Sequence, residues 1–320
     1  MNRRIVLLVL SVLLLAAAAP AQALAPPEGP QLTVLADTPR VEPQLDLITM
    51  GPGGQSPQTV IKNAGSSRPS WSADGSLMAF GSNLESTSEV VAVAEVGGPG
   101  ARVFKHAPLE GNPVMAPDGR TVAYPYEGTV WLLDVASGSV RRALPARSYE
   151  GLEPSSFSPD GSNLAGTVGW LWGNSVAVDL RTGRVSLLAR EASKPVYSPD
   201  GSEVAFIRWK NWRASAVDDG SQPIDELRVT RVGTFPRSRL LRRSHKFLAW
   251  PSWDPSGQRL AYTRTRVVEN GYTDPKKGDA LMAINADGTC LKRVYTDRET
   301  TLYGSAWRPG PGREAGPISC

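Results

Sequence analysis

The feature that most constrains the fold is a short corner motif that recurs along the chain. Its clearest copy is Pro69-Ser70-Trp71-Ser72-Ala73-Asp74-Gly75, which precedes the apolar run 77–80. Each copy combines a bulky residue, a turn, and an alanine five residues after the aspartate or serine of that turn. The bulky residues are Trp71, Met115, Phe157, Tyr197, Trp253 and, in a truncated copy, Trp307; the turns are Asp74-Gly75, Asp118-Gly119, Asp160-Gly161, Asp200-Gly201 and Ser256-Gly257; the alanines are Ala79, Ala123, Ala165, Ala205 and Ala261.

The chemistry of the motif predicts a tight hairpin between antiparallel strands. Proline sets φ at the first corner of a type I turn, aspartate tolerates the second, and glycine takes the left-handed position that follows. A large residue before the turn and a small one after it indicate two crowded strands packed face to face. We therefore interpret the aspartates as turn formers and assign them no catalytic or metal-binding role.

The spacing of the copies indicates a β-propeller. The turn residues follow one another at intervals of 44, 42, 40, 56 and 54 residues, from Asp74 to Gly310. Strand-and-turn repeats with a period near 40 residues are typical of propeller blades. With 31 glycines, 27 prolines and short alternating strands, the chain is predicted to be all-β.

The repeat resembles the WD-like propeller repeat of the TolB family, in which W-S-P-D-G precedes an I-A-F strand and a later strand. The chain supplies those later strands at 90–95, 130–134, 176–179, 227–231 and 281–285. The resemblance covers about residues 31–310, and it implies a periplasmic protein-interaction module. TolB itself carries a separate α/β domain before its propeller, but here only the eight residues 24–31 separate the predicted signal segment from the first predicted strand. Functions that need that domain are therefore not transferred.

The two ends of the chain are predicted to complete one blade together. Three strands are predicted near the N-terminus, at 32–36, 45–50 and 59–62, but no strand there carries the bulky residue of the repeat. The missing strand is present around Trp307. We expect the C-terminal strand to join the N-terminal blade, which closes a ring of six blades and removes exposed sheet edges. The propeller then spans 31–310, with a C-terminal tail at 311–320.

Residues 1–23 are predicted to be a secretory signal peptide. Arg3 and Arg4 precede an apolar run from Ile5 to Ala19, and small residues flank a cleavage site after Ala23. The alternative is an uncleaved anchor, although the run is short for a membrane span. A proline-rich lead-in, residues 24–30, follows.

Charge balance argues against nucleic acid as a partner. Loss of Arg3 and Arg4 lowers Lys+Arg from 35 to 33, against 31 Asp+Glu, so the net charge falls from +4 to +2. We expect a periplasmic or extracellular monomer that is not held in the membrane after cleavage. In that compartment Cys290 and Cys320 are predicted to form a disulfide, the alternative being two free thiols.

Three neighbouring connections are the predicted binding face. Two repeats are longer than the others, and their extra residues fall between the second and third predicted strands, at 209–223 and 264–278. The repeat before them adds residues 169–173 at the same connection. Aromatic and arginine side chains on loops of a rigid scaffold are typical of binding surfaces. The candidate residues are Trp170, Trp172, Trp209, Trp212, Arg213 and Tyr272. The alternative is that some of these tryptophans continue strands, Trp209 above all. A basic segment, 228–246, is interpreted as a solvated propeller edge or as a surface for anionic polymers.

No catalytic motif is present in the sequence. There is no Gly-x-Ser-x-Gly elbow, His106 and His245 are too few for a histidine-rich metal site, and neither has an acid at a suitable spacing. Residues 217–226 are a weak calcium candidate. We expect a non-enzymatic scaffold that binds a protein, peptide or envelope polymer and needs no cofactor. The alternative is a propeller enzyme acting on carbohydrate, which needs a pair of carboxylates in the central channel.

Overall fold

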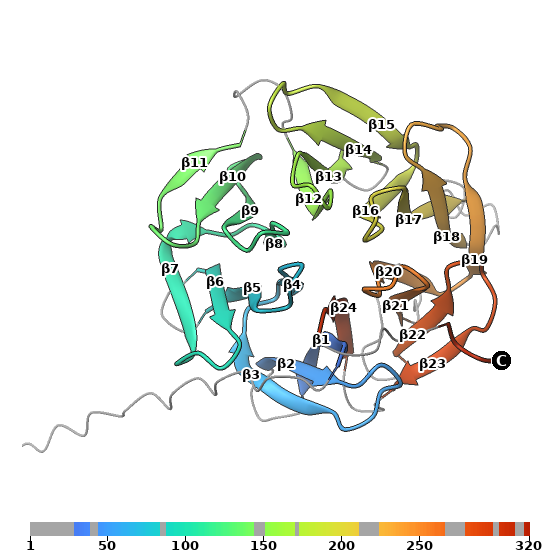
Figure 1. Cartoon of the computed structure of the whole chain (residues 1–320), viewed down its shortest axis with the longest axis horizontal. Coiled ribbons are helices and arrows are strands. Elements are labelled where there is room, and N and C mark those ends of the chain that lie inside the picture. The colour runs from blue at the N-terminus through green and yellow to red at the C-terminus, as the bar shows by residue number, and fades with distance from the viewer. Residues whose placement is uncertain are drawn as a thin grey trace, which may run out of the picture.

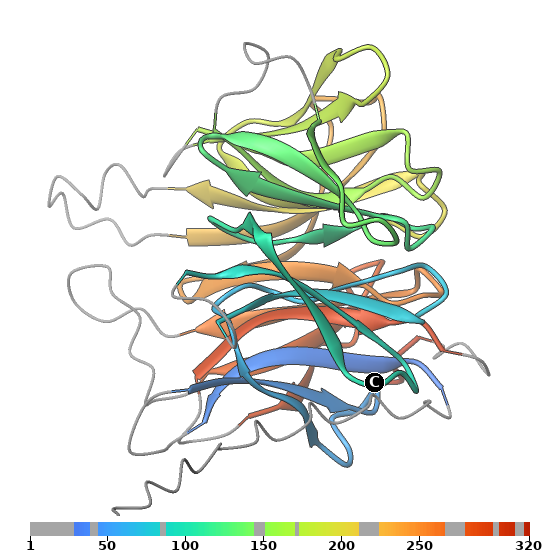
Figure 2. The same cartoon turned by 90° about the vertical axis from the view of Figure 1, so that its left-hand side faces the viewer.

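The computed structural model describes residues 29–38, 44–83, 88–143, 151–169, 173–210, 224–265, 279–296, 301–310 and 317–320. Within these ranges the chain forms strands and turns and no helix, which confirms the all-β prediction. The predicted signal segment, residues 1–23, lies outside them. The strands form sheets arranged around a centre (Figure 1). In the side view the strands run between the two faces of this ring (Figure 2).

Four sheets each contain four consecutive strands, and a larger one contains the first and the last described strands. The larger sheet comprises β24 (Thr301–Arg308), β1 (Gln31–Thr38), β2 (Gln44–Met50), β3 (Gln58–Ala64), β4 (Ser70–Trp71), β5 (Leu77–Ser82), β6 (Val90–Glu95) and β7 (Ala101–Pro108). The other four comprise β8 (Val114–Met115), β9 (Thr121–Tyr126), β10 (Thr129–Asp134) and β11 (Val140–Arg142); β12 (Leu152–Phe157), β13 (Asn163–Val168), β14 (Asn174–Asp179) and β15 (Val185–Ala189); β16 (Ala192–Tyr197), β17 (Glu203–Lys210), β18 (Ile224–Arg231) and β19 (Arg239–Ser244); and β20 (Phe247–Trp253), β21 (Arg259–Thr265), β22 (Ala280–Asn285) and β23 (Lys292–Tyr295).

The larger sheet has two halves. One Cα pair, Ala64 with Ser82, joins β3 to β5, whereas the strands within each half pair more extensively. In the first half β24 runs antiparallel to β1 and places Trp307 opposite Leu32. The last described strand therefore pairs with the first. Strands β4, β8, β12, β16, β20 and β24 lie nearest the centre of the ring (Figure 1).

The core lies between neighbouring sheets, where the repeated slots meet. The five repeat alanines are completely buried, and Trp71, Trp253 and Trp307 are at most 8% exposed. One cluster joins Ala205 on β17 to Trp253 and Tyr262 of the next sheet. A small residue opposite a large one lets adjacent sheets approach closely, because protein interiors are packed at high density. The repeat thus specifies how one sheet packs on the next.

The corner aspartates have the geometry of turn formers. The Ser72 hydroxyl donates to the Asp74 carboxylate at 2.6 Å, and the Ser76 amide donates to the same oxygen at 3.0 Å. These bonds, that from Ser72 foremost, lower the pKa of Asp74. Asp160 and Asp200 make the same contacts with their own serines.

The fifth copy exchanges the two roles. Asp254 occupies the place of the serine and accepts the Arg259 amide at 2.9 Å. Ser256 occupies the place of the aspartate and donates its hydroxyl to Asp254 at 2.8 Å. The turn closes with the same pair of residue types in reverse order, which explains how the variant Ser256-Gly257 fits the repeat.

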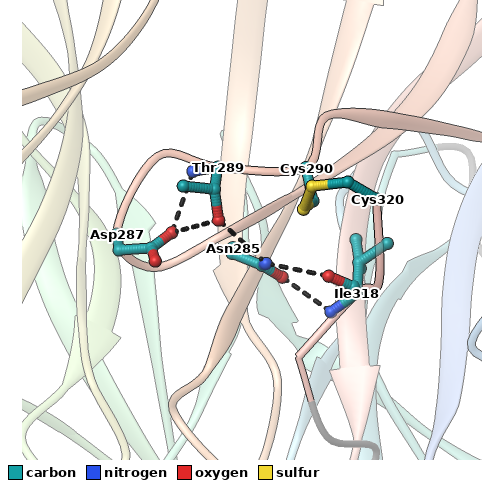
Figure 3. The surroundings of a disulfide bond; sticks show 6 residues. All are labelled: Asn285, Asp287, Thr289, Cys290, Ile318 and Cys320. Atoms are coloured by element: carbon teal, nitrogen blue, oxygen red, sulfur yellow. Dashed lines mark hydrogen bonds between the residues drawn. A yellow bond between two sulfur atoms is a disulfide. The ribbon is translucent and has the colours of Figure 1, made fainter.

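A disulfide ties the C-terminal residues to the last complete sheet. Cys290 follows the turn after β22, and its Cα lies 5.0 Å from that of Cys320, with the two sulfurs bonded (Figure 3). The Asn285 side chain pairs with the backbone of Ile318 in both directions, at 3.0 and 2.7 Å. The predicted cysteine pairing is therefore present in the structure.

Candidate binding site at the channel mouth

One end of the inner strands carries a cluster of polar and aromatic side chains around the centre of the ring. In each repeat we consider the slot three residues before the bulky residue. The occupants of this slot are Arg68, Asn112, Pro154, Lys194, Trp250 and Gly304. Together with Glu153, the residue before Pro154, four of them form what we call the mouth belt: Arg68, Asn112, Glu153, Lys194 and Trp250.

Backbone bulges orient two members of the belt. The strand register shifts between Ser193 and Val196 in β16 and between Ala249 and Ser252 in β20. Within these bulges Lys194 and Trp250 both have φ of 56°. This left-handed conformation is unfavourable for bulky residues, and bulges commonly redirect a side chain next to a functional site. The backbone is therefore strained at two positions that face the opening.

Hydrogen bonds and an ion pair link the polar members of the belt. The Arg68 amide donates to the Asn112 side chain at 2.7 Å, and that side chain donates to Glu153 at 3.2 Å. The Lys194 ammonium lies 2.5 Å from the same Glu153 oxygen. Its nitrogen also lies 4.0 Å from the centroid of the Trp250 ring, a cation–π distance. Side chains from neighbouring sheets thus contact one another in sequence around the opening.

Arg68 completes the circle by lying across β24. Its Nε donates to the Ser305 carbonyl at 2.8 Å, and its guanidinium carbon is 5.8 Å from the Trp250 ring centroid. A β-carbon added at Gly304 would lie 2.9 Å from Cγ of Arg68. The glycine therefore provides the space through which Arg68 reaches Trp250.

The two cations of the belt are only partly solvated. Burial lowers the pKa of Arg68 to about 10. Burial also lowers the pKa of Lys194; Glu153 acts in the opposite direction, and the charge of Arg68 adds to the lowering. Arg68 makes no ion pair within the described part of the chain, whereas Lys194 has Glu153. The opening therefore presents positive charge in an environment poorer in water than a free surface.

A cavity of about 270 Å³ extends from the belt along the inner strands. Its described lining contains Arg68, Asn112 and Trp250 at the mouth and mainly apolar residues and serines beyond them. The far end is lined by turn residues: Ala73, Pro117, Pro159, Pro199, Pro255 and Pro309. No aspartate or glutamate belongs to this described lining.

The predicted binding residues fall mostly outside the described ranges. Five of them lie outside those ranges, and their role stays a prediction: Trp170, Trp172, Trp212, Arg213 and Tyr272. Trp209 is described. It lies in β17, opposite Asp225, and packs partly buried against the core, as the strand interpretation of this residue expects.

The described strand ends that border part of the predicted face lie at the same end of the ring as the belt. Strand β16 begins beside the end of β17, since Ala192 pairs with Arg208. The described residues Lys210 and Ile224, which border the segment containing Trp212, therefore lie near the beginning of the inner strand that carries Lys194. The belt residues are not among the site residues predicted from the sequence. The available signal was the slot three residues before the bulky residue, which holds arginine, asparagine, proline, lysine, tryptophan and glycine in the six copies.

The basic segment is largely occupied by contacts within the protein. Glu226 on β18 is completely buried and forms ion pairs with Arg228 at 2.9 Å, Arg243 at 2.7 Å and Lys210 at 3.4 Å. Burial raises the pKa of Glu226, but hydrogen bonds from Arg243 and Arg228 outweigh this effect and leave the pKa below its ordinary value. These arginines neutralise a buried carboxylate, which favours the structural interpretation.

Neither a membrane-spanning helix nor a metal-binding cluster occurs in the part of the chain that the structure describes. No helix there is long and apolar enough to cross a bilayer. No three His, Cys, Asp or Glu residues of the described ranges lie together as metal ligands.

Comparison with solved structures identifies the fold. The chain superposes on TolB from Acinetobacter baumannii with a TM-score of 0.70 at 18% identity, covering 88% of this chain and 67% of that one. For putative TolB from Agrobacterium tumefaciens the TM-score is 0.59 at 14% identity, with 88% and 99% covered. For a chain of a nidogen/laminin complex it is 0.62 at 12% identity, with 88% and 98% covered. The sequence matches no protein-family model and no curated protein. At these identities the likeness establishes fold alone, and the fold is that of a TolB-like β-propeller.

Proposed function

We propose that this chain is an exported, non-enzymatic scaffold that binds a protein or peptide partner at the mouth of its central channel. The observation that carries the proposal is the mouth belt. Lys194 and Trp250 are held around an opening by a left-handed backbone that costs each of them roughly 1–2 kcal/mol. Backbone strain of this kind is concentrated at ligand-binding and catalytic sites.

The scaffold we propose is a six-bladed ring, residues 31–310, closed by β24 on β1. Residues 1–23 are its signal peptide, 24–30 a lead-in and 311–320 a tail. The pairing of Leu32 with Trp307 supports the closure. The Cys290–Cys320 disulfide supports export, because disulfides persist mainly in oxidising compartments.

A binding role agrees better with the cavity than carbohydrate cleavage does. Glycoside hydrolysis requires two carboxyl groups on either side of the scissile bond, and the described lining offers an arginine, an amide, hydroxyls and aromatic rings. A chain from a nidogen/laminin complex shares the fold, which supports a protein as the partner. We propose that Trp170, Trp172, Trp209, Trp212, Arg213 and Tyr272 extend the same binding face.

Site-specific photo-crosslinking would test the proposed location. A photoreactive residue at Asn112, in the belt, should capture a partner from envelope fractions, whereas the same residue at Arg181, exposed near the opposite end, should not. The triple variant Trp170→Ala, Trp172→Ala, Trp212→Ala should reduce capture at Asn112. Equal capture at both positions, or none at Asn112, would contradict a partner site at this mouth.

A further inference from the structure

The mouth belt has more hydrogen-bonding capacity for an anion than the protein itself uses. A guanidinium has five N–H donors. Arg68 directs one to the Ser305 carbonyl and another, at 3.5 Å, to the Pro251 carbonyl. Both acceptors are neutral, and Arg68 forms none of the ion pairs present among the described residues. Its remaining donors are available to a ligand.

Two acids whose partners adjoin Arg68, Glu153 and Glu89, are occupied by other groups. Glu153 accepts from both Asn112 and Lys194. Glu89 accepts from the backbone amide of Ser66 at 3.1 Å and from its hydroxyl at 2.7 Å, and it also accepts the hydroxyl of Ser67. Two cations and one carboxylate thus make up the charges of the belt itself, and the belt carries an excess of one positive charge.

We propose, building on the function proposed above, that the partner inserts a peptide carboxylate into this belt, where Arg68 and Lys194 bind it beside the Trp250 ring. The carboxylate is either the C-terminus of the peptide or an aspartate or glutamate side chain. Arginine suits this role because its planar fork matches both oxygens of a carboxylate.

The cavity behind the belt favours a peptide over a sugar polymer. Its volume of about 270 Å³ is at the small end of ligand pockets, so it admits a chain end or one or two side chains. Trp71, Met115, Phe157 and Val196 contribute to its lining. Apolar side chains next to the bound carboxylate match such walls, whereas each buried sugar hydroxyl would need a hydrogen-bonding partner.

Gly304 is the positioning residue of this site. It lies beneath the Arg68 side chain, and a β-carbon there would come within 3.0 Å of both Cβ and Cγ of Arg68. The substitution Gly304→Ala therefore displaces the Arg68 side chain while leaving every charge in place, and it adds the backbone cost of an L-residue at φ of 45°. It separates the effect of position from the effect of net charge.

Equilibrium dialysis against four pools of N-acetylated hexapeptides would test the proposal. The pools have a free or an amidated C-terminus, each with or without aspartate and glutamate, and mass spectrometry measures the bound fraction. Preference for a free C-terminus or for acidic residues identifies the source of the carboxylate. An oligomer of galacturonic acid serves as the sugar-acid probe.

Three variants and one control give the readout. Arg68→Gln and Lys194→Gln should each weaken binding of carboxylate-containing pools at least about tenfold, because hydrogen bonds to charged groups are among the strongest. Gly304→Ala should weaken it as well. Arg102→Gln should leave it unchanged, although Arg102 also donates to two carbonyls and lies over an aromatic ring, on the outer strand β7.

The outcomes separate this inference from the proposed function. Equal binding of the amidated, acid-free pool would overturn the carboxylate site but leave a scaffold that captures a partner through Asn112. Absence of binding by all four pools, or stronger binding of the galacturonic acid oligomer, would also overturn it. Should Arg68→Gln fail to fold, Lys194→Gln decides, because the contacts of Lys194 do not involve β24.

Discussion

Left-handed backbone at Lys194 predicts an inverted preference between glycine and alanine. Both Lys194→Gly and Lys194→Ala remove the side chain and its ion pair with Glu153, so the difference between them reports only on the backbone. An L-residue in this conformation costs roughly 1–2 kcal/mol, and glycine in place of alanine costs about 0.5–1 kcal/mol of backbone entropy. We therefore expect Lys194→Gly to be more stable than Lys194→Ala by about 0.5–1 kcal/mol.

Lys292 provides the matched control. It lies in β23 opposite Ala283, is exposed, and is not among the residues with positive φ. There Lys292→Ala should be more stable than Lys292→Gly by about 0.5–1 kcal/mol. Subtracting the glycine–alanine difference in stability at position 292 from that at position 194 cancels the backbone entropy of glycine. The remainder is the backbone strain at position 194, about 1–2 kcal/mol.

Urea unfolding measures these differences as shifts of the midpoint at a common slope. The same four proteins are then tested for peptide binding. Lys194→Gly should lose binding at least about tenfold, as is expected of Lys194→Gln, while both Lys292 variants should keep it. A difference between the two pairs near zero, or alanine favoured at both positions, would refute the reasoning that position 194 is strained.

Four further predictions concern the frame and its response to pH. Ala205→Leu should destabilise by about 1–3 kcal/mol in urea unfolding, because a completely buried alanine has no room for three more carbons; an effect below 0.5 kcal/mol would contradict the packing. Replacing Cys290 and Cys320 by serine should cost about 2–4 kcal/mol, since the bond closes 30 residues of sequence, and added reductant should then have no effect on the variant. Hydrogen bonds from serines lower the pKa of Asp160, so its contribution to the free energy of unfolding is complete above the ordinary pKa of 3.8 and is lost as the pH falls through the lower pKa of the folded state. Asp160→Asn should therefore reduce the pH dependence of the free energy of unfolding in that window, measured by acid unfolding. Trp307→Ala should cost about 3–5 kcal/mol, and a small effect would show that closure by β24 matters little.

The sequence predicts the frame because every sheet repeats the same local chemistry. The turn residues, the bulky slot and Ala205 each have a counterpart in every full copy, so five observations support one interpretation. Strand ranges follow from the same copies: residues 90–95 and 281–285 lie within or coincide with β6 and β22. The cysteine pairing follows from the expectation of export, because the chain has two cysteines and disulfides persist in oxidising compartments.

The belt could not be predicted in the same way because it depends on contacts between different sheets. Lys194 and Trp250 lie in strand-like sequence, and nothing local marks their left-handed conformation. The path of Arg68 depends on Gly304, 236 residues later in the chain. Such a glycine has no obvious role until the ring brings it beneath the arginine.

The departure of one slot from the repeat is the physical reason to place function at this end of the ring. Glycine accepts a left-handed backbone at lower cost, and Gly304, with φ of 45°, occupies the same slot in β24. Lysine and tryptophan in that conformation together cost roughly 2–4 kcal/mol, a considerable part of the 5–15 kcal/mol that stabilises a typical domain. The other end of the cavity is lined mainly by prolines in turns, and none of the described residues that line it there has a positive φ. If stability alone determined these residues, glycine would suit positions 194 and 250 better, which supports our proposal that the two side chains act at the mouth.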